Sequence, residues 1–229
     1  MRRILLISPV MATLVLFGSA DAQTCSGLAS FAHGPWQVFG TAGFADNVKS
    51  FGGGLSFGGT GAFGQVNLGT ASYDNVDGSS LLYGGGAGYQ IPLGQKRLAH
   101  LCPTASIGLA SGPNNVDVFG DGSLVLDLSE TDLSFGVSLG VLASQSPQTQ
   151  IIPTGSLSFV SATLKASDDV SGASDSQTET FGLLGLGIGF VFNQVVTVRP
   201  SVSIPFGLDG ASTTFAATFS VNFGGKPVR

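Results

Sequence analysis

The side chains that carry most enzyme chemistry are scarce in this chain. Its 229 residues include only two histidines, His33 and His100. Hydrolytic chemistry needs a general base, usually histidine, beside a nucleophile or a bound water. Both histidines fall near one predicted rim of the fold, away from the acidic segments, so we interpret each as a surface residue. No histidines and cysteines occur at metal-ligand spacing, and the glycine-rich runs lack the lysine of a phosphate-binding loop. The sequence therefore predicts no enzyme activity, no cofactor and no bound metal.

The two cysteines, Cys25 and Cys102, predict a disulfide bond. An even number of cysteines in an exported chain is typical of disulfide pairing. The strand assignment given below brings both residues to the same rim of the fold. The alternative is a pair of free thiols that lie too far apart to meet.

Charged side chains suggest two further sites. Asp168, Asp169 and Asp175 form a cluster of carboxylates, the oxygen ligands that hard divalent cations prefer. The alternative is that these carboxylates are merely solvated. Arg199 falls in the polar phase of a strand, so we expect it inside the fold. There it serves either as a structural residue bonded to a carboxylate or to serines, or as a pore charge that tunes the passage of anions.

Residues 1–22 have the pattern of a cleaved signal peptide. Two arginines precede an apolar stretch, and residues 20–22 form a small-x-small cleavage site. We therefore expect residues 23–35 to form a periplasmic lead-in and residues 224–229 a periplasmic tail. A lipoprotein is the competing interpretation because Cys25 follows closely. However, the residues before Cys25 lack the small residue expected next to a lipidated cysteine.

The body of the chain, residues 36–223, alternates apolar and polar side chains. A period of two is typical of β-strands, whose successive side chains point to opposite faces. The clearest example runs from Val195 to Phe206. Charged residues make up 10% of the chain, mean hydropathy is +0.38, and 35 residues are glycine, which weakens helices. High hydropathy without a membrane helix favours a closed barrel, because every backbone polar group in lipid must be paired.

We therefore predict an all-β fold: a closed antiparallel up-and-down transmembrane barrel of about ten strands, with eight or twelve as alternatives. Lipid surrounds it, its interior is polar, and short turns alternate with longer loops. Apparent phase slips near residues 129–131 and 159–160 predict bulges or breaks; alternatively, the first half of the former strand protrudes beyond the membrane. The expected strands are 36–45, 51–58, 62–73, 81–91, 101–110, 123–143, 151–166, 180–192, 195–206 and 215–223.

Charges are distributed unequally between the two ends of this predicted barrel. Most aspartates fall in the longer loops, and Glu130 and Asp132 lie beside segments assigned to that side. Lys96, Arg97, Lys226 and Arg229 fall on the short-turn side or in the tail. The strand centres are almost free of charge, as a bilayer interior requires. We therefore expect acidic extracellular loops and both termini in the periplasm.

These features resemble the small outer-membrane β-barrel proteins of Gram-negative-type bacteria, the opacity-protein and OmpA-like group. The resemblance covers residues 36–223, and its most specific part is the last strand, where Phe219, Val221 and Phe223 alternate with polar residues. In that group such a strand is the signal read by the barrel-assembly machinery, so the resemblance implies this role for the three residues. Here a tail follows the final aromatic residue, which usually ends the chain. The implied surroundings are outer-membrane lipid, and we expect no nucleic-acid partner.

That architecture hosts adhesins, narrow pores and a few enzymes, so it does not decide the function. The first hypothesis is a non-enzymatic surface or envelope component whose acidic extracellular loops bind a ligand or a cell-surface partner. The alternative is a narrow pore for small solutes, because inward glycines leave space in the lumen. An outer-membrane enzyme, such as a lipid deacylase or protease, and a soluble secreted β-sandwich are the remaining interpretations.

Overall fold

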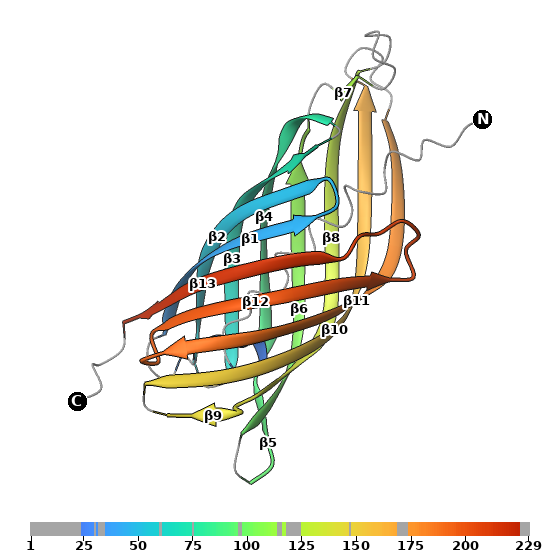
Figure 1. Cartoon of the computed structure of the whole chain (residues 1–229). Helices are drawn as coiled ribbons and strands as arrows, with labels where there is room; N and C mark the ends of the chain where they lie inside the picture. Colours follow the sequence, from blue (N-terminus) through green and yellow to red (C-terminus); the bar gives the residue numbers. More distant parts are fainter. Residues whose placement is uncertain are drawn as a thin grey trace.

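The structure, a computed structural model, is a closed barrel of ten long antiparallel strands (Figure 1). It describes residues 24–29, 31, 35–59, 61–74, 76–95, 98–113, 116–117, 125–146, 148–168 and 174–224. Within these residues no helix is long and apolar enough to span a membrane. The long strands are β1 (Trp36–Ala45), β2 (Val48–Gly58), β3 (Ala62–Tyr73), β4 (Val76–Tyr89), β6 (Ala99–Ser111), β8 (Val125–Val141), β10 (Thr149–Asp168), β11 (Ser174–Phe192), β12 (Val196–Phe206) and β13 (Thr214–Phe223); β5 (Ile91–Leu93), β7 (Val116–Asp117) and β9 (Ser144–Gln145) are short.

The barrel closes between its first and last strands. β1 pairs with β2 on one side and with β13 on the other, with Trp36 opposite Phe223 and Phe44 opposite Phe215. Every other long strand pairs with the long strands before and after it, and β6 pairs with β8 across the connection that contains β7. The predicted closed, ten-stranded, up-and-down barrel is therefore confirmed. We call the rim with Trp36 and Phe223 the terminal rim, and the opposite one the far rim.

Alternation along each strand separates the two faces of the wall. On β8, Leu133, Phe135 and Leu139 point outward, and Phe135 is 65% exposed. Ser134 points inward, where its hydroxyl lies 2.7 Å from that of Ser106. Each of the ten long strands contributes exposed large apolar side chains to the outer surface. The outside of the cylinder is therefore a continuous apolar belt, a surface that water disfavours.

Aromatic side chains mark both ends of β1. At the terminal rim Trp36 packs on Phe57 with ring centroids 5.8 Å apart. At the far rim Phe44 packs edge-on to Phe51 at 6.1 Å. Aromatic girdles at two heights are typical of barrels whose middle lies in a bilayer. The ten residues of β1 match the roughly 9–11 that a tilted strand needs to cross.

The last strand places its predicted insertion residues on this outer face. Phe219 and Phe223 point outward from β13 and are 53% and 44% exposed. Val221 shares their phase and lies opposite Val38 of β1. Their role in barrel insertion stays a prediction.

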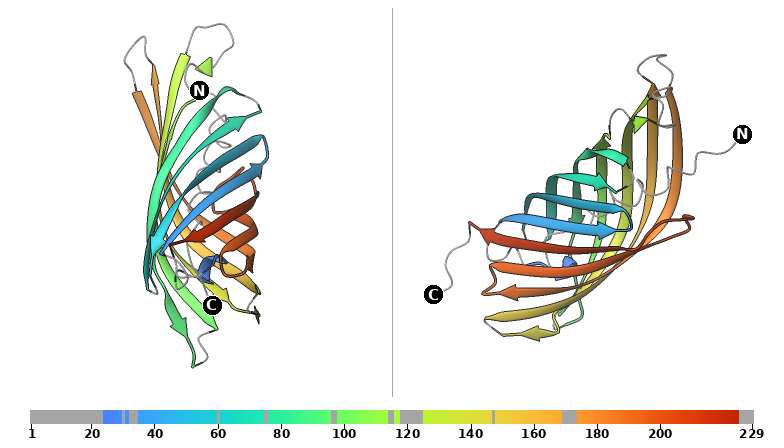
Figure 2. Two further views of the ribbon diagram at one scale, coloured as in Figure 1. Left: turned by 90° about the vertical axis from the view of Figure 1, so that its left-hand side faces the viewer. Right: turned by 45° about the horizontal axis from the view of Figure 1, so that its top comes forward.

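One side of the barrel rises above the rest at the far rim (Figure 2). β8, β10 and β11 contain 17, 20 and 19 residues, whereas β1 and β13 contain 10 each. The pairing of β11 with β12 begins at Gly182, so the preceding part of β11 extends beyond its neighbour. We name the far-rim parts of the three strands, residues 127–132, 161–168 and 174–181, the ridge.

The two predicted phase slips are wrong. β8 and β10 pair through residues 129–131 and 159–160 with no shift of register. On β10, the apolar side chains Val160, Ala162 and Leu164 point into the far-rim half of the barrel instead. The sequence predicted a polar interior. In the structure, apolar residues also line the interior near the far rim. One such cluster contains Val160, Ala162, Leu164, Phe181 and Leu208, and another contains Val48, Ala71, Leu82 and Ala110.

The far rim also has shorter connections than the sequence predicted. Asp46 and Asn47 alone join β1 to β2, and Asn47 has a φ of 61°, a left-handed conformation that asparagine tolerates. Residues 76–80 and 174–177, predicted as polar loops, belong to β4 and β11. The error has a physical reason: a strand that continues past the apolar belt has no outward apolar side chains to show its period.

Candidate functional site in the barrel lumen

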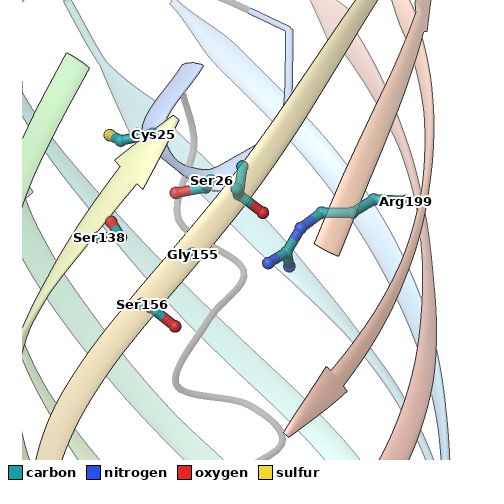
Figure 3. A pocket seen from close by; sticks show the side chains of 7 residues that line it. Cys25, Ser26, Ser138, Gly155, Ser156 and Arg199 are labelled. Atoms are coloured by element: carbon teal, nitrogen blue, oxygen red, sulfur yellow. The ribbon is translucent and has the colours of Figure 1, made fainter. Parts of the chain in front are cut away.

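Residues 24–29, which we call the inner segment, lie inside the barrel near the terminal rim (Figure 3). The 3₁₀ helix η2 (Thr24–Ser26) contacts β6, β8 and β10. Cys25, Leu28 and Ala29 have no exposed surface. The backbone amide of Ala29 donates a hydrogen bond to Thr197 Oγ1 of β12 at 3.1 Å. The sequence predicted that these residues form a lead-in ahead of the barrel. The structure packs them inside the lumen that the wall encloses.

A disulfide bond attaches the inner segment to the wall. Cys25 and Cys102 are bonded, with Cα atoms 6.1 Å apart. Cys102 points into the lumen from β6, and both cysteines are 0% exposed and packed with Phe31 and Phe63. The structure thus contains the disulfide that the sequence predicted, and places it inside the lumen.

Two wall glycines make room for the backbone of the inner segment. A Cβ at Gly140 of β8 would overlap the carbonyl oxygen of Thr24, and one at Gly189 of β11 would overlap that of Gly27. Gly27 itself has a φ of +72°, which glycine adopts without strain. The inward glycines of β11 were predicted to leave open lumen space; at Gly189 this space holds the inner segment, and at Gly187 it holds the side chains of Arg199 and Thr154.

Arg199 points into the lumen from β12 and is 6% exposed, the position that the sequence predicted. Its guanidinium lies across Gly187, where a Cβ would come within 3.1 Å of Nε and 3.2 Å of Nη2. A cavity of about 10 Å³ borders it, which is room for about one water molecule. The space is thus far too small for an organic substrate. Its lining consists of Cys25, Ser26, Ser138, Thr154, Gly155, Ser156 and Arg199 (Figure 3).

The seam between β1 and β13 is bridged from the inside. Gln37 is 0% exposed, and its Nε2 donates to Ser220 Oγ at 3.1 Å and to Asn222 Oδ1 at 2.6 Å. Each such bond contributes a net stabilisation of about 0.5–1.5 kcal/mol. Sequence reasoning did not single out Gln37, although its place in the polar phase of the first strand was visible.

His100 is a lumen residue, so its interpretation as a surface histidine is wrong. It points inward from β6, is 9% exposed, and its Nδ1 lies 2.7 Å from Nε2 of Gln90. An amide nitrogen only donates, so Nδ1 of His100 is the acceptor in this hydrogen bond. The inward phase follows from Cys102, two residues further along the strand. His33 lies outside the described residues.

The two alternatives for Asp168, Asp169 and Asp175, a cation site or solvated carboxylates, stay untested, because Asp169 lies outside the described residues. Asp175 is exposed and accepts a hydrogen bond from the amide of Ser176 at 2.8 Å. Across the part of the chain that the structure describes, no three His, Cys, Asp or Glu side chains gather closely enough to hold a metal ion.

Two carboxylates that the sequence assigned to the loop side lie inside the barrel. Glu130 and Asp132 point inward from β8 and are 2% and 5% exposed. None of their four carboxylate oxygens has a hydrogen-bond partner outside the pair among the described residues, and the two groups interact with each other. Their strand neighbours are small or apolar: Ala110 and Leu164 beside Glu130, and Gly108 and Ala162 beside Asp132.

Neutralising this pair is expected to stabilise the barrel. Burial of a carboxylate without a partner is costly, and a second carboxylate nearby adds repulsion. The double variant E130Q/D132N keeps both shapes and should raise the free energy of unfolding by about 1–3 kcal/mol. Urea unfolding in detergent, followed by the fluorescence of the single tryptophan, measures the change. D175N, at an exposed position, is the control and should stay within about 0.5 kcal/mol. A less stable double variant would show that the carboxylates have a partner.

No protein-family model matches the sequence, and no curated protein matches it. Three solved bacterial β-barrels illustrate the fold-level similarity. The N-terminal barrel domain of Pseudomonas aeruginosa OprF is 14% identical over 82% of this chain and 96% of that chain, with a TM-score of 0.33. Ail, the attachment invasion locus protein of Yersinia pestis, is 14% identical over 82% and 96%, with a TM-score of 0.39. The β domain of the Bordetella autotransporter BrkA is 15% identical over 84% and 100%, with a TM-score of 0.43.

Proposed function

We propose that this chain is an integral β-barrel of a bacterial outer membrane and a non-enzymatic component of the cell envelope, with the ridge as its interaction surface. The observation that carries the proposal is the belt of exposed apolar side chains around a sealed cylinder. Each square ångström of apolar surface left in water costs about 25 cal/mol. Hydrocarbon removes this cost, and closure leaves no unpaired strand edge within the belt.

The orientation follows from where the barrel begins and ends. Trp36 and Phe223 lie at the same rim, and the signal peptide expected at residues 1–22 delivers the chain to the periplasm. We therefore assign the terminal rim to the periplasm and the far rim to the cell exterior. The ridge then projects from the cell surface.

The ridge suits contact with an extended, polar partner segment. Its outward face carries hydroxyl groups, among them Thr163 and Thr178, whose Oγ1 atoms lie 2.9 Å apart. In the described residues, the part of β11 before Gly182 pairs with β10 and has no strand paired to its other side. Such an edge presents backbone donors and acceptors to which an incoming strand adds. Asp175 and Glu179 on this strand favour a partner segment that carries basic side chains.

A non-enzymatic role is supported by where the chemistry-bearing residues lie. His100 is enclosed in the lumen near the terminal rim, whereas the exposed carboxylates Asp46, Asp74 and Asp175 lie at the far rim. A general base and its substrate-facing partners must be within about 3 Å of each other. This separation favours binding over catalysis.

The membrane assignment is tested with purified, refolded protein. We expect it to require detergent and to migrate differently on SDS gels before and after boiling, because a closed barrel resists SDS until heated. In planar bilayers we expect no current steps, since the inner segment lies inside the lumen near the terminal rim and apolar clusters fill it near the far rim. Protein that stays soluble and monomeric without detergent would overturn the proposal.

A further inference from the structure

We infer that Glu130 and Asp132 bind a divalent cation, of which Ca²⁺ suits their oxygen ligands best, inside the far-rim half of the barrel. This inference goes beyond the proposed envelope function, which concerns the outer surface of the barrel and holds whether or not the interior contains a metal ion.

The pair places two acidic groups in one enclosed position. Glu130 and Asp132 are two residues apart on β8, so both side chains leave the inner face of the strand, with Cα atoms about 7 Å apart. They are 2% and 5% exposed, and outside the pair no described residue bonds to their oxygens. Two buried carboxylates without a counter-charge are costly. The position therefore requires a positive partner.

The described basic side chains do not supply this partner. Lys49 pairs with Asp74 at 2.8 Å, and Lys165 is exposed on the outer face of β10. Arg199 lies beside Gly27 of the inner segment, towards the other rim. The far-rim connections contain no lysine, arginine or histidine; they are residues 46–47, 74–75, 112–124, 169–173 and 207–213. We therefore expect the counter-charge to come from outside the chain.

A divalent cation meets this need better than protons do. One shared proton leaves a net negative charge in the same enclosed position. Protonation of both groups leaves at least one O–H donor beside Ala110, Ala162 and Leu164, whose side chains offer no acceptor. Ca²⁺ neutralises both carboxylates at once and accepts six to eight oxygen ligands in flexible geometry, water among them.

Asn67 offers a further oxygen at the same level of the barrel. Asn67, Gly84, Gly108 and Asp132 follow one another in register across β3, β4, β6 and β8. The side-chain oxygen of Asn67 leans over Gly84, 3.5 Å from the position of a Cβ there. Neither glycine has a side chain to fill the two strand spacings, about 4.8 Å each, between Gly84 and Asp132. We assign Asn67 as a ligand through one water molecule.

The interior has room for bound water beside the pair. Ser106 and Ser134 face the lumen from the strand positions next to Gly108 and Asp132, yet they are only half-buried. Inward residues elsewhere on the wall, such as Thr197, are 0% exposed, so this exposure faces an open space inside the barrel. A polar space of this kind holds water, which completes the coordination of the cation.

The cation must bind before the barrel is complete. Ala110, beside Glu130, packs with Val48 and Leu82, and Ala162, beside Asp132, packs with Phe181. These apolar clusters cover the pair on the far-rim side. Binding is therefore coupled to folding, as at other structural metal sites, and the folded barrel should retain the ion.

Metal content after refolding tests the site. Denatured, metal-free protein is refolded into detergent with excess calcium chloride, freed of unbound ions by gel filtration, and analysed by elemental mass spectrometry. We expect one calcium ion per wild-type chain and none in E130Q/D132N. D175N removes an exposed carboxylate at the same rim and should retain the ion. N67A should release it to a chelator faster than the wild type does.

Urea unfolding in calcium and in chelator gives the second readout. A ligand that binds only the folded protein raises its stability, so calcium should raise the urea midpoint of the wild type and leave that of E130Q/D132N unchanged. The higher stability expected above for the double variant applies to the metal-free protein, and calcium should narrow that difference.

Wild-type protein that folds in calcium and retains none overturns the inference, while the envelope function stands. Equal retention by the wild type and E130Q/D132N overturns it as well, because the ion then binds elsewhere. A shift of mobility on boiling shows that each protein is folded. If the double variant does not fold, E130Q and D132N are measured singly, and each should retain less calcium than D175N.

Discussion

Replacement of both Cys25 and Cys102 by alanine is expected to lower the free energy of unfolding by about 4 kcal/mol. The bond spans 77 residues, and a cross-link over so long a loop removes much of the conformational entropy of the unfolded chain. In the folded barrel it also fixes the inner segment against β6. Urea unfolding of the variant and the wild type, without reductant and in the same detergent, gives the difference.

The control for this experiment is S26A. Ser26 neighbours Cys25, is 3% exposed, and its hydroxyl has no hydrogen-bond partner among the described residues. Its truncation perturbs the same buried turn without touching the cross-link, so we expect a change below about 1 kcal/mol. If C25A/C102A lowers the free energy of unfolding by no more than S26A does, the disulfide bond does not constrain the unfolded chain as its position in the sequence implies.

Arginine in place of Phe135 is expected to cost about 2–4 kcal/mol of folding free energy in a lipid bilayer. Phe135 is 65% exposed on the outer face of β8, in the middle of the apolar belt between Leu133 and Val137. A guanidinium there must enter hydrocarbon or draw water into it. Reversible unfolding from lipid vesicles in guanidinium chloride measures this cost.

T131R provides the matched comparison on the same strand and the same face. Thr131 lies four residues closer to the far rim, past the last outward leucine, and is exposed. An arginine at the membrane edge costs only about 0–1 kcal/mol. Equal costs at the two positions would mean that the belt does not end where the outward side chains turn polar.

The strands of the wall could be predicted because the alternation of apolar and polar residues is a local property of each strand. The bounds 36–45 and 62–73 expected from alternation match β1 and β3, since each outward residue must be apolar regardless of what lies across the lumen. The phase also placed Arg199 correctly inside. The rule fails where the strand leaves the belt, as it does at residues 76–80, because no lipid then selects the outward side chains.

The contents of the lumen were not predictable in the same way. Nothing local in residues 24–29 indicates that they pack against Gly140 and Gly189, because that contact is set by the closed cylinder and not by the pattern of the segment. Charge misled the assignment of Glu130 and Asp132, which were placed beside the long loops although they continue the inward phase of Ser134. Unbroken alternation was the better guide.

The barrel closes through the pairing of β1 with β13, so it can close only in a chain that contains both strands. Gln37 reaches residues 183 and 185 positions away in the sequence, among the most distant contacts a chain of this length can make, and such contacts form slowly. A shorter chain that lacks β13, the final ten residues of the wall, is an open sheet with two unpaired strand edges, to which other strands can add. A prematurely terminated product is therefore exposed to aggregation and degradation, whereas the full-length chain pairs its two strand edges with each other when β1 meets β13.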